Sequence, residues 1–276
     1  MSAITTPDEA ARAAFRQAAA RAAQGTLPAS PASVGLLGEK TLHRAVKLFL
    51  EPDEALHEQK IGPYVADILN GQGAFEVQTR GFYRLGKKLP SLLALAPVTV
   101  VYPLPRLKWL VWVDPKTGEA SPRRRSGKTY GPLDALPELF WLAGRLSDPR
   151  LAVRLIFIDL VEIRLLDGWG NGGKRGSSRA DRIPLELSGD IALCSPGDYA
   201  AAFLPGLPSP FTAKDLQKAG RLSPRGAASA LRVLLAAGVV RQEGKCGRAF
   251  LYIPVSPPPA QFPAETGCKP ETNLLK

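Results

Sequence analysis

The chain has 276 residues, of which 45% are hydrophobic and 22% are charged, and this mixture excludes a wholly disordered or fibrous protein. The length favours two domains over one. Basic residues outnumber acidic ones by 36 to 25, which gives a formal net charge of +11. Such an excess favours a polyanionic partner, and a solvated, solubilising surface is the alternative explanation.

The two ends of the chain predict little structure. The first residues lack the apolar centre and cleavage site of a secretory signal, so we expect a cytoplasmic protein. No membrane-spanning helix is expected, because the longest uncharged stretch is interrupted by prolines and falls short of the roughly 20 apolar residues that a bilayer requires. Residues 1–35, rich in alanine, and residues 255–276, rich in proline, are expected to be flexible tails.

Residues 36–105 predict the order α-β-β-β-α-β. Leu42, Val46 and Phe49 recur at helical spacing in a first helix over residues 36–50. The apolar period then changes to two, which predicts short strands, and Asn70-Gly71-Gln72-Gly73 is a tight-turn sequence between the last two of them. The remaining elements are listed by range: strands over 57–61, 64–69 and 74–80, a helix over 82–95 and a strand over 98–102.

Beyond residue 105 the sequence predicts a hairpin, a helix and one more strand before a separate C-terminal pattern. The hairpin begins at 108–113 and leads into an arginine-rich loop, the helix covers 133–146, and the strand lies within 152–166. The loop carries four basic residues and no acidic one, Arg123, Arg124, Arg125 and Lys128. A further net charge of +3 lies between Gly170 and Arg182.

Residues 199–254 predict a small second domain. Thr212 with Asp215 three residues later is typical of a capping box, and a longer helix runs from Ser223 to Ala237, where Gly238 ends it. Residues 239–253 alternate on both sides of a glycine-containing turn, as in a β-hairpin. The stretch from 204 to 254 carries eight basic and two acidic residues, a net +6, which favours DNA as its partner.

The hairpin at residues 64–80 predicts two opposed carboxylates. If Asn70 pairs with Gly73, Asp67 faces Glu76, and directly opposed side chains have Cβ atoms roughly 4.5–5.5 Å apart, where like charges repel. A divalent cation such as Mg²⁺ or Mn²⁺ would stabilise this pair; a neighbouring lysine or arginine would do so equally well. The opposite face is apolar and is expected to enter the core, with Ala66, Ile68, Phe75 and Val77.

These residues resemble the PD-(D/E)XK nuclease superfamily. The resemblance is carried by the order α-β-β-β-α-β, by Glu39 in the first helix, by Asp67 in the second strand and by Glu76-Val77-Gln78 in the third. The runs 64–68, 75–80 and 100–103 are also similar to a group of uncharacterised bacterial proteins of that kind. The resemblance implies an α/β fold, with a restriction-endonuclease-like αβββαβ core in a domain over residues 36–195, and hydrolysis of phosphodiester bonds in DNA with Mg²⁺ or Mn²⁺ as cofactor.

The same resemblance implies a role for each motif residue. Asp67, Glu76 and the Val77 carbonyl would hold the metal, Glu39 would assist through water, and Gln78 would orient the attacking water. Gln78 stands where the superfamily usually has a lysine, and a neutral amide supplies no positive charge. Lys87 or Lys88 on the next helix could supply that charge; the alternative is a catalytically inactive DNA-binding or regulatory protein.

The C-terminal pattern resembles a winged-helix domain, here over residues 199–254, and this implies DNA contacts from its second helix and its hairpin. The expected contact residues are Arg225 and Arg232 on the helix and Arg241, Lys245 and Arg248 on the hairpin. The arginine-rich loop is a further candidate, as are Lys174 and Arg175 at the end of a glycine-rich loop that lacks the Ser or Thr of an NTP-binding motif. A protein-assembly module whose basic loops bind an acidic partner is the alternative from another class.

Overall fold

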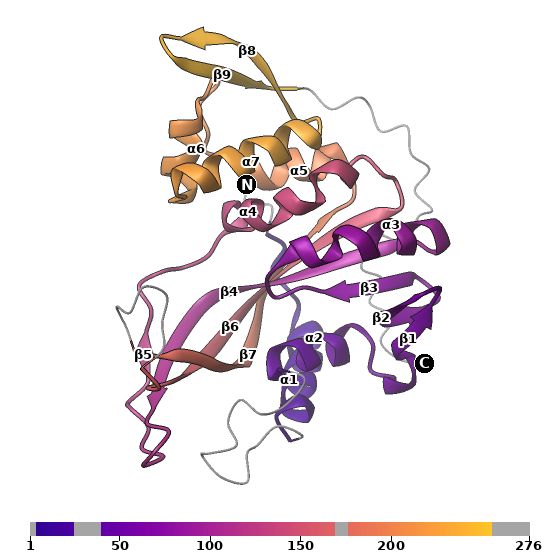
Figure 1. Ribbon diagram of the computed structural model, residues 1–276, viewed down its shortest axis with the longest axis vertical. Coiled ribbons are helices and arrows are strands. Elements are labelled where there is room, and N and C mark those ends of the chain that lie inside the picture. Colours follow the sequence, from indigo (N-terminus) through magenta and orange to yellow (C-terminus); the bar gives the residue numbers. More distant parts are fainter. Residues whose placement is uncertain (1–3, 25–39, 169–175, 256–276) are drawn as a thin grey trace.

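The computed structural model describes residues 4–24, 40–168 and 176–255 (Figure 1). Its α-helices are α1 (Glu9–Gln24), α2 (Thr41–Leu50), α3 (Leu85–Leu95), α4 (Leu136–Leu139), α5 (Pro196–Phe203), α6 (Ala213–Gly220) and α7 (Pro224–Ala236). Short 3-10 helices are η2 (Glu54–Leu56), η3 (Phe82–Arg84), η4 (Pro132–Ala135) and η5 (Phe140–Arg145). The strands are β1 (His57–Ile61), β2 (Tyr64–Asn70), β3 (Gly73–Val77), β4 (Val98–Val113), β5 (Arg124–Arg125), β6 (Leu151–Leu165), β7 (Ser178–Leu193), β8 (Val240–Cys246) and β9 (Ala249–Pro254).

The protein has an α/β fold built on a mixed sheet. Six of its strands are hydrogen-bonded in the order β1-β2-β3-β4-β6-β7, and β5 pairs with β4 as the seventh. β3, β4 and β6 are parallel, and the pairs β1–β2, β2–β3 and β6–β7 are antiparallel. A parallel pair requires a crossover connection, which α3 provides between β3 and β4. From α2 to β4 the elements follow the predicted order α-β-β-β-α-β.

The hairpin of β2 and β3 has the predicted register. Asn70 pairs with Gly73 and Ile68 with Phe75, as predicted, and Asp67 and Glu76 are the next residues beyond the last of these pairs. Gly73 adopts a positive φ of +119°, and a Cβ there would lie 2.4 Å from the carbonyl oxygen of Pro97. Only glycine fits this turn, which holds the start of β3 against the chain that enters β4. The turn therefore fixes which side chains share a face of the hairpin.

Both faces of the sheet are buried. On one face, α1 and α2 pack over an apolar cluster that includes Leu42, Val46, Ile68, Phe75 and Val77. On the other face lies a larger cluster, to which α3, α4, α5 and α7 all contribute (Figure 1). Ile68, Phe75 and Val77 are thus buried on one face as predicted, whereas the buried Ala66 belongs to the cluster on the other face. The C-terminal helix α7 shares one continuous core with the sheet.

The expectation of a flexible tail is wrong for residues 9–24, which form α1. Phe15 and Ala22 are fully buried, and the buried residues Phe15, Ala18, Ala19 and Ala22 recur at helical spacing. The alanines on this face let the backbone of α1 approach α2 closely, and Phe15 packs edge-on against Phe49 at a centroid distance of 5.4 Å. Thr5, before the helix, pairs with Asp190 on β7. This segment is part of the core.

The second half of the sheet is larger than the sequence predicted. β4 runs on through the expected 108–113 strand, β5 returns antiparallel to it, and β6 covers the strand expected within 152–166. No strand was predicted where β7 lies, because Pro184, Gly189 and several charges interrupt its alternation and bulges shift its register with β6. The segment 132–145 is helical, as expected, in three short pieces.

The C-terminal elements lie where the sequence predicted them. Thr212 caps α6 by accepting a hydrogen bond from the Asp215 backbone, and Ser223 caps α7 by accepting one from the Gly226 backbone. β8 and β9 form an antiparallel hairpin after α7. In the part of the chain that the structure describes, no helix is long and apolar enough to cross a bilayer.

Candidate functional site

A pocket of about 850 Å³ opens at the carboxyl end of β3. Its lining includes Asp67, Glu76, Val77 and Gln78, so the predicted motif residues of β2 and β3 converge on one concave site. Glu39, the fourth predicted catalytic residue, lies outside the described residues. The other walls come from the start of α2, from η3 and α3, and from the first residues of β7.

Local geometry explains why the motif residues meet. The Gln78 backbone donates a hydrogen bond of 2.8 Å to the carbonyl of Val101, which keeps the chain extended just past the end of β3. Gly81 then adopts a left-handed conformation (φ +70°) and turns the chain into η3. α3 returns along the sheet and brings Lys88 back to Glu76. The end of β3 is therefore surrounded by helices on two sides.

One carboxylate oxygen of Asp67 contacts two hydrogen-bond partners. Its Oδ2 accepts a bond of 2.7 Å from the Val77 backbone and lies 3.3 Å from Nε2 of His43 on α2. Burial by itself raises the pKa of Asp67. The hydrogen bond and charge of His43, the Val77 amide and the Lys88 charge together outweigh burial, so the pKa lies below its usual value. Asp67 is therefore an anionic, oriented carboxylate.

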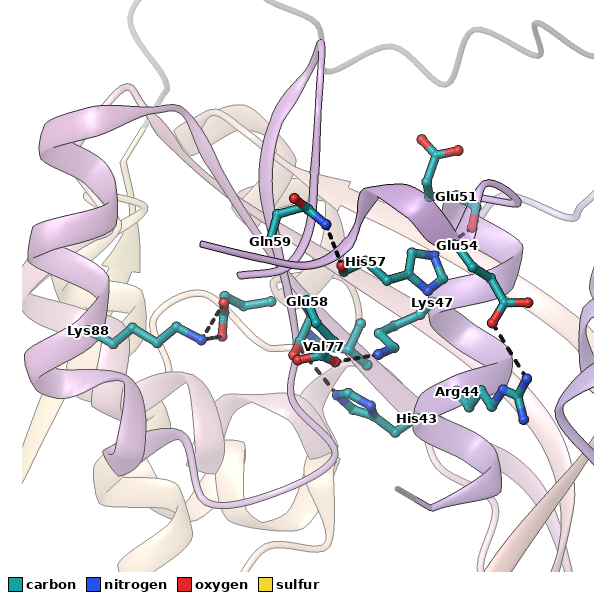
Figure 2. Close-up of polar contacts among 12 residues, drawn as sticks. His43, Arg44, Lys47, Glu51, Glu54, His57, Glu58, Gln59, Val77 and Lys88 are labelled. Carbon is teal, nitrogen blue, oxygen red and sulfur yellow. Dashed lines mark hydrogen bonds and ion pairs between the residues drawn. The ribbon is translucent and has the colours of Figure 1, made fainter. Parts of the chain in front are cut away.

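Glu76 differs from Asp67 in the direction of its pKa shift. Its residue is only 1% exposed, and Lys88 Nζ lies 2.6 Å from Oε1 and 2.7 Å from Oε2. Burial first, and then the negative charge of Asp67, raise the pKa of Glu76 to about 7, although Lys88 opposes them. Oε1 has no well-aligned hydrogen-bond donor among the described residues. Figure 2 shows Lys88 reaching in from α3 on one side and His43 from α2 on the other.

Lys88 is thus one of the two lysines that the sequence offered as a source of positive charge, and it reaches the carboxylates. Lys87 is exposed, and its backbone carbonyl accepts a hydrogen bond from the Tyr64 hydroxyl. Among the described residues, no group of three or more His, Cys, Asp and Glu side chains could hold a metal ion. Asp67 and Glu76 are the two carboxylates that the hairpin contributes to the pocket.

Basic side chains outnumber acidic ones in the lining of the pocket. The six basic residues are Lys40, Arg80, Arg84, Lys88, Arg179 and Arg182, and the three acidic ones are Asp67, Glu76 and Asp181. Sequence reasoning singled out only Lys88 among the basic ones. Arg179 and Arg182 were missed because no strand was predicted there, although the net positive charge between Gly170 and Arg182 was a signal.

The predicted DNA-contacting residues that the structure describes do not line the pocket, and they lie in separate places. β5, which contains Arg124 and Arg125, and the β8–β9 hairpin lie at opposite ends of the molecule (Figure 1). Arg123 stacks over the ring of Trp109 at 4.1 Å. Lys128 lies 4.2 Å from the Tyr130 ring and 2.7 Å from an Asp134 oxygen. Lys174 and Arg175 lie outside the described residues.

The C-terminal candidates are all exposed. Arg225 and Arg232 lie on α7, and Arg232 also contacts the Phe140 ring at 5.7 Å. On the hairpin, Arg241 forms an ion pair with Glu243 and Lys245 lies 4.7 Å from the Phe250 ring. Arg248 lies in the turn between the two strands. The exposed charges of this module are available to a polyanion.

Comparison with known proteins places the pocket inside a defined segment. Residues 40–194 match the family described as "Domain of unknown function (DUF8091)". An "Uncharacterized protein" of Treponema pallidum (strain Nichols) is 29% identical over 236 residues, which cover 83% of this chain and 93% of that protein. No solved structure gives a significant match. Every residue that lines the pocket falls within the family segment, whereas α6, α7 and the β8–β9 hairpin follow it.

Proposed function

The chain belongs to the family of the domain of unknown function DUF8091, and we propose from its site that it is a metal-dependent nuclease that hydrolyses phosphodiester bonds in DNA in the cytoplasm. The observation that carries the proposal is the convergence of Asp67, Glu76 and Gln78 on one pocket with basic walls. Paired carboxylates suit a divalent cation, and basic walls suit a phosphodiester. The two features together suit cleavage of a nucleic acid.

The arrangement of elements supports the resemblance to the PD-(D/E)XK superfamily. The order of elements from α2 to β4 is that of the restriction-endonuclease-like core, and Asp67 and Glu76 lie on adjacent strands within it. The pocket opens where β3 ends, beside both carboxylates. The position of the pocket in the fold therefore supports the proposed resemblance.

The donor set fits Mg²⁺ or Mn²⁺. Two carboxylates from opposed strands are hard oxygen ligands, and the buried Glu76 Oε1 lacks an aligned donor among the described residues. The repulsion that raises the pKa of Glu76 is the cost that a cation would remove. Asp67, Glu76 and the Val77 carbonyl would hold the ion, which when bound neutralises phosphate charge and makes water more acidic.

The remaining residues of the pocket have separate tasks. The Gln78 amide, at the end of β3, orients the attacking water by hydrogen bonding. Lys88 supplies the positive charge that Gln78 lacks, because its Nζ lies within 2.6 Å of the Glu76 carboxylate. His43 orients Asp67 through the contact to Oδ2. The lining arginines attract the phosphodiester to the carboxylates.

The C-terminal elements support a winged-helix DNA-binding domain. α6 and α7 form the helix pair, and β8 and β9 form the wing. Exposed arginines on both parts, Arg225 and Arg232 on α7 and Arg241 and Arg248 on the hairpin, are available to the DNA backbone. In this view the C-terminal domain supplies affinity and the pocket supplies chemistry.

One observation favours a second candidate, a catalytically inactive DNA-binding protein. The Lys88–Glu76 ion pair balances the charge of the buried carboxylate without a metal, and Gln78 in place of lysine removes a positive charge from the motif. A protein of this kind would bind DNA through its basic surfaces and leave it intact. The two candidates differ in one measurable property, which is turnover.

The test is a cleavage assay with the full-length protein on linear, nicked, branched and single-stranded DNA in Mg²⁺ or Mn²⁺. We expect cleavage of at least one form, and its loss by at least a hundredfold in Glu76→Ala with DNA binding retained. Glu119→Gln, which changes an exposed glutamate outside the pocket, is the matched control and should cleave normally. Tight binding with no cleavage of any form by the wild type would favour the inactive candidate.

A further inference from the structure

Arg179 is a half-buried cation with an unusual environment. It lies on the second residue of β7, lines the pocket and is paired across the sheet with Arg164 of β6. Arg182 and Arg80 are the cations that act most strongly on it, and both repel it. No carboxylate within the described parts of the chain lies within ion-pair distance of its guanidinium. Glu162 attracts the Arg179 cation, but more weakly than Arg182 and Arg80 repel it.

The neighbouring basic residues of the sheet show that this arrangement is an exception. Arg154 on β6 donates to both carboxylate oxygens of Asp190. Arg164, Arg182 and Lys108 all surround Glu162, at distances of 2.9, 3.2 and 3.4 Å. These half-buried cations are neutralised by the fold, as is usual for buried charge. Arg179, in contrast, has no carboxylate ion-pair partner among the described residues.

Arg80 and Arg84 are two further arginines of this pocket. Both are exposed and line the pocket, and neither has a carboxylate partner among the described residues. Arg84 contacts the Tyr83 side chain, through its hydroxyl at 3.4 Å and its ring. The arginines therefore form a basic wall in the same pocket as the carboxylates of Asp67 and Glu76.

The surroundings of Arg179 disfavour the charged form of its guanidinium. Burial first, and then the charges of Arg182 and Arg80, lower its pKa to about 10. A perturbed pKa of this kind in a pocket is expected where a ligand supplies the missing negative charge. A guanidinium presents parallel N–H donors that match two oxygens of a phosphate group. The volume of about 850 Å³ lies within the range of small-ligand pockets, roughly 300–1,000 Å³.

We propose that Arg179, together with Arg80, forms an anion subsite that binds a backbone phosphate of a nucleic-acid strand beside the paired carboxylates. This inference rests on the proposed function and assigns its substrate contact to β7, a strand outside the motif. Arg179 is fixed by the sheet and positions the phosphate, whereas the exposed Arg80 closes over it from the end of β3. Binding by this subsite needs no metal.

The experiment measures binding to the full-length protein in EDTA, by calorimetry and by the shift of melting temperature. The probes are the dinucleotide 5′-phospho-thymidylyl-thymidine and inorganic phosphate. Because EDTA removes divalent metals, the result does not depend on whether the protein cleaves DNA. We expect the wild type to bind the dinucleotide at least several-fold more tightly than inorganic phosphate. Equal affinity would assign the subsite to free phosphate and overturn the proposal.

Two variants and one control separate this role from a structural one. Arg179→Gln should weaken dinucleotide binding at least tenfold, and its melting temperature without ligand should stay the same or rise, because a repelled cation is removed. Arg80→Gln, an exposed change that the fold tolerates, should weaken binding several-fold. Arg154→Gln removes a paired half-buried arginine, so it should lower the melting temperature and keep binding. If both pocket variants bind the dinucleotide as the wild type does, the subsite does not exist.

Discussion

The two carboxylates that the hairpin contributes to the pocket differ in charge although they lie on adjacent strands. Hydrogen bonds and the His43 charge hold the pKa of Asp67 below its usual value, whereas burial and the Asp67 charge raise that of Glu76 to about 7. At neutral pH the pair therefore carries between one and two negative charges. A cation that binds this pair releases protons, so its affinity should increase with pH.

Metal binding to the carboxylates should stabilise the folded protein. Mg²⁺ or Mn²⁺ should raise the melting temperature of the wild type, because an ion that binds only the folded state stabilises it. Asp67→Asn should abolish the shift with the fold intact, and Glu119→Gln should keep it. Differential scanning fluorimetry over a metal titration measures this. Equal shifts in wild type and Asp67→Asn would remove the carboxylate pair as the metal site.

The pH dependence of stability follows from Glu76. Its folded pKa of about 7 lies above the ordinary value of 4.5, so between these values the folded state binds more protons than the unfolded state. Stability from this group is fully present below about pH 4.5 and is lost as pH rises through about 7, by about 3 kcal/mol at most. Glu76→Gln in EDTA should therefore gain stability relative to wild type between pH 5 and 8. Urea denaturation at several pH values measures the difference, and a constant difference would contradict it.

At the scale of elements, α1 determines how firmly α2 is held beside the pocket. Phe15 is fully buried between α2 and the sheet, and α2 carries His43 toward Asp67. Phe15→Ala should lower the free energy of unfolding by about 3 kcal/mol or more, because it removes buried apolar surface and leaves a cavity. Phe250→Ala, at an exposed position on β9, should change it little. Chemical denaturation compares the two, and similar small losses would show that α1 is loosely attached.

Some elements of the fold could be predicted from the sequence and others could not. The hairpin of β2 and β3 could be predicted with its register, because a two-residue turn and alternating side chains determine both. α1 could not be recognised as core, because alanine spacing does not distinguish a packed helix from a solvated one. β7 was missed because its bulges break the period of two. The carboxylates of the site were therefore predictable, and the arginines that line the same pocket were not.

At the scale of the whole molecule, affinity for DNA should come from exposed charge spread over both ends. Removing one arginine that binds a phosphate should reduce the slope of log K against log salt by about 0.9. Arg225→Ala with Arg232→Ala should therefore reduce the slope by about 2 in full-length protein on duplex DNA. Arg150→Ala, an exposed arginine before β6, is the control and should leave the slope unchanged. Binding that does not respond to salt would favour an acidic protein as the partner.

The place of β7 in the sheet has a consequence for how the protein is made. The carboxylates of β2 and β3 emerge from the ribosome early, whereas β7 is the last strand of this sheet to emerge, after β6. A nascent chain can therefore form the hairpin, and with it the opposed charges of Asp67 and Glu76, while Arg179 is still unmade. Pairing between distant segments is slow relative to local hairpin formation. Arg80 and Arg84 follow β3 directly, so the anion subsite becomes complete only when β7 adds Arg179 to the finished sheet.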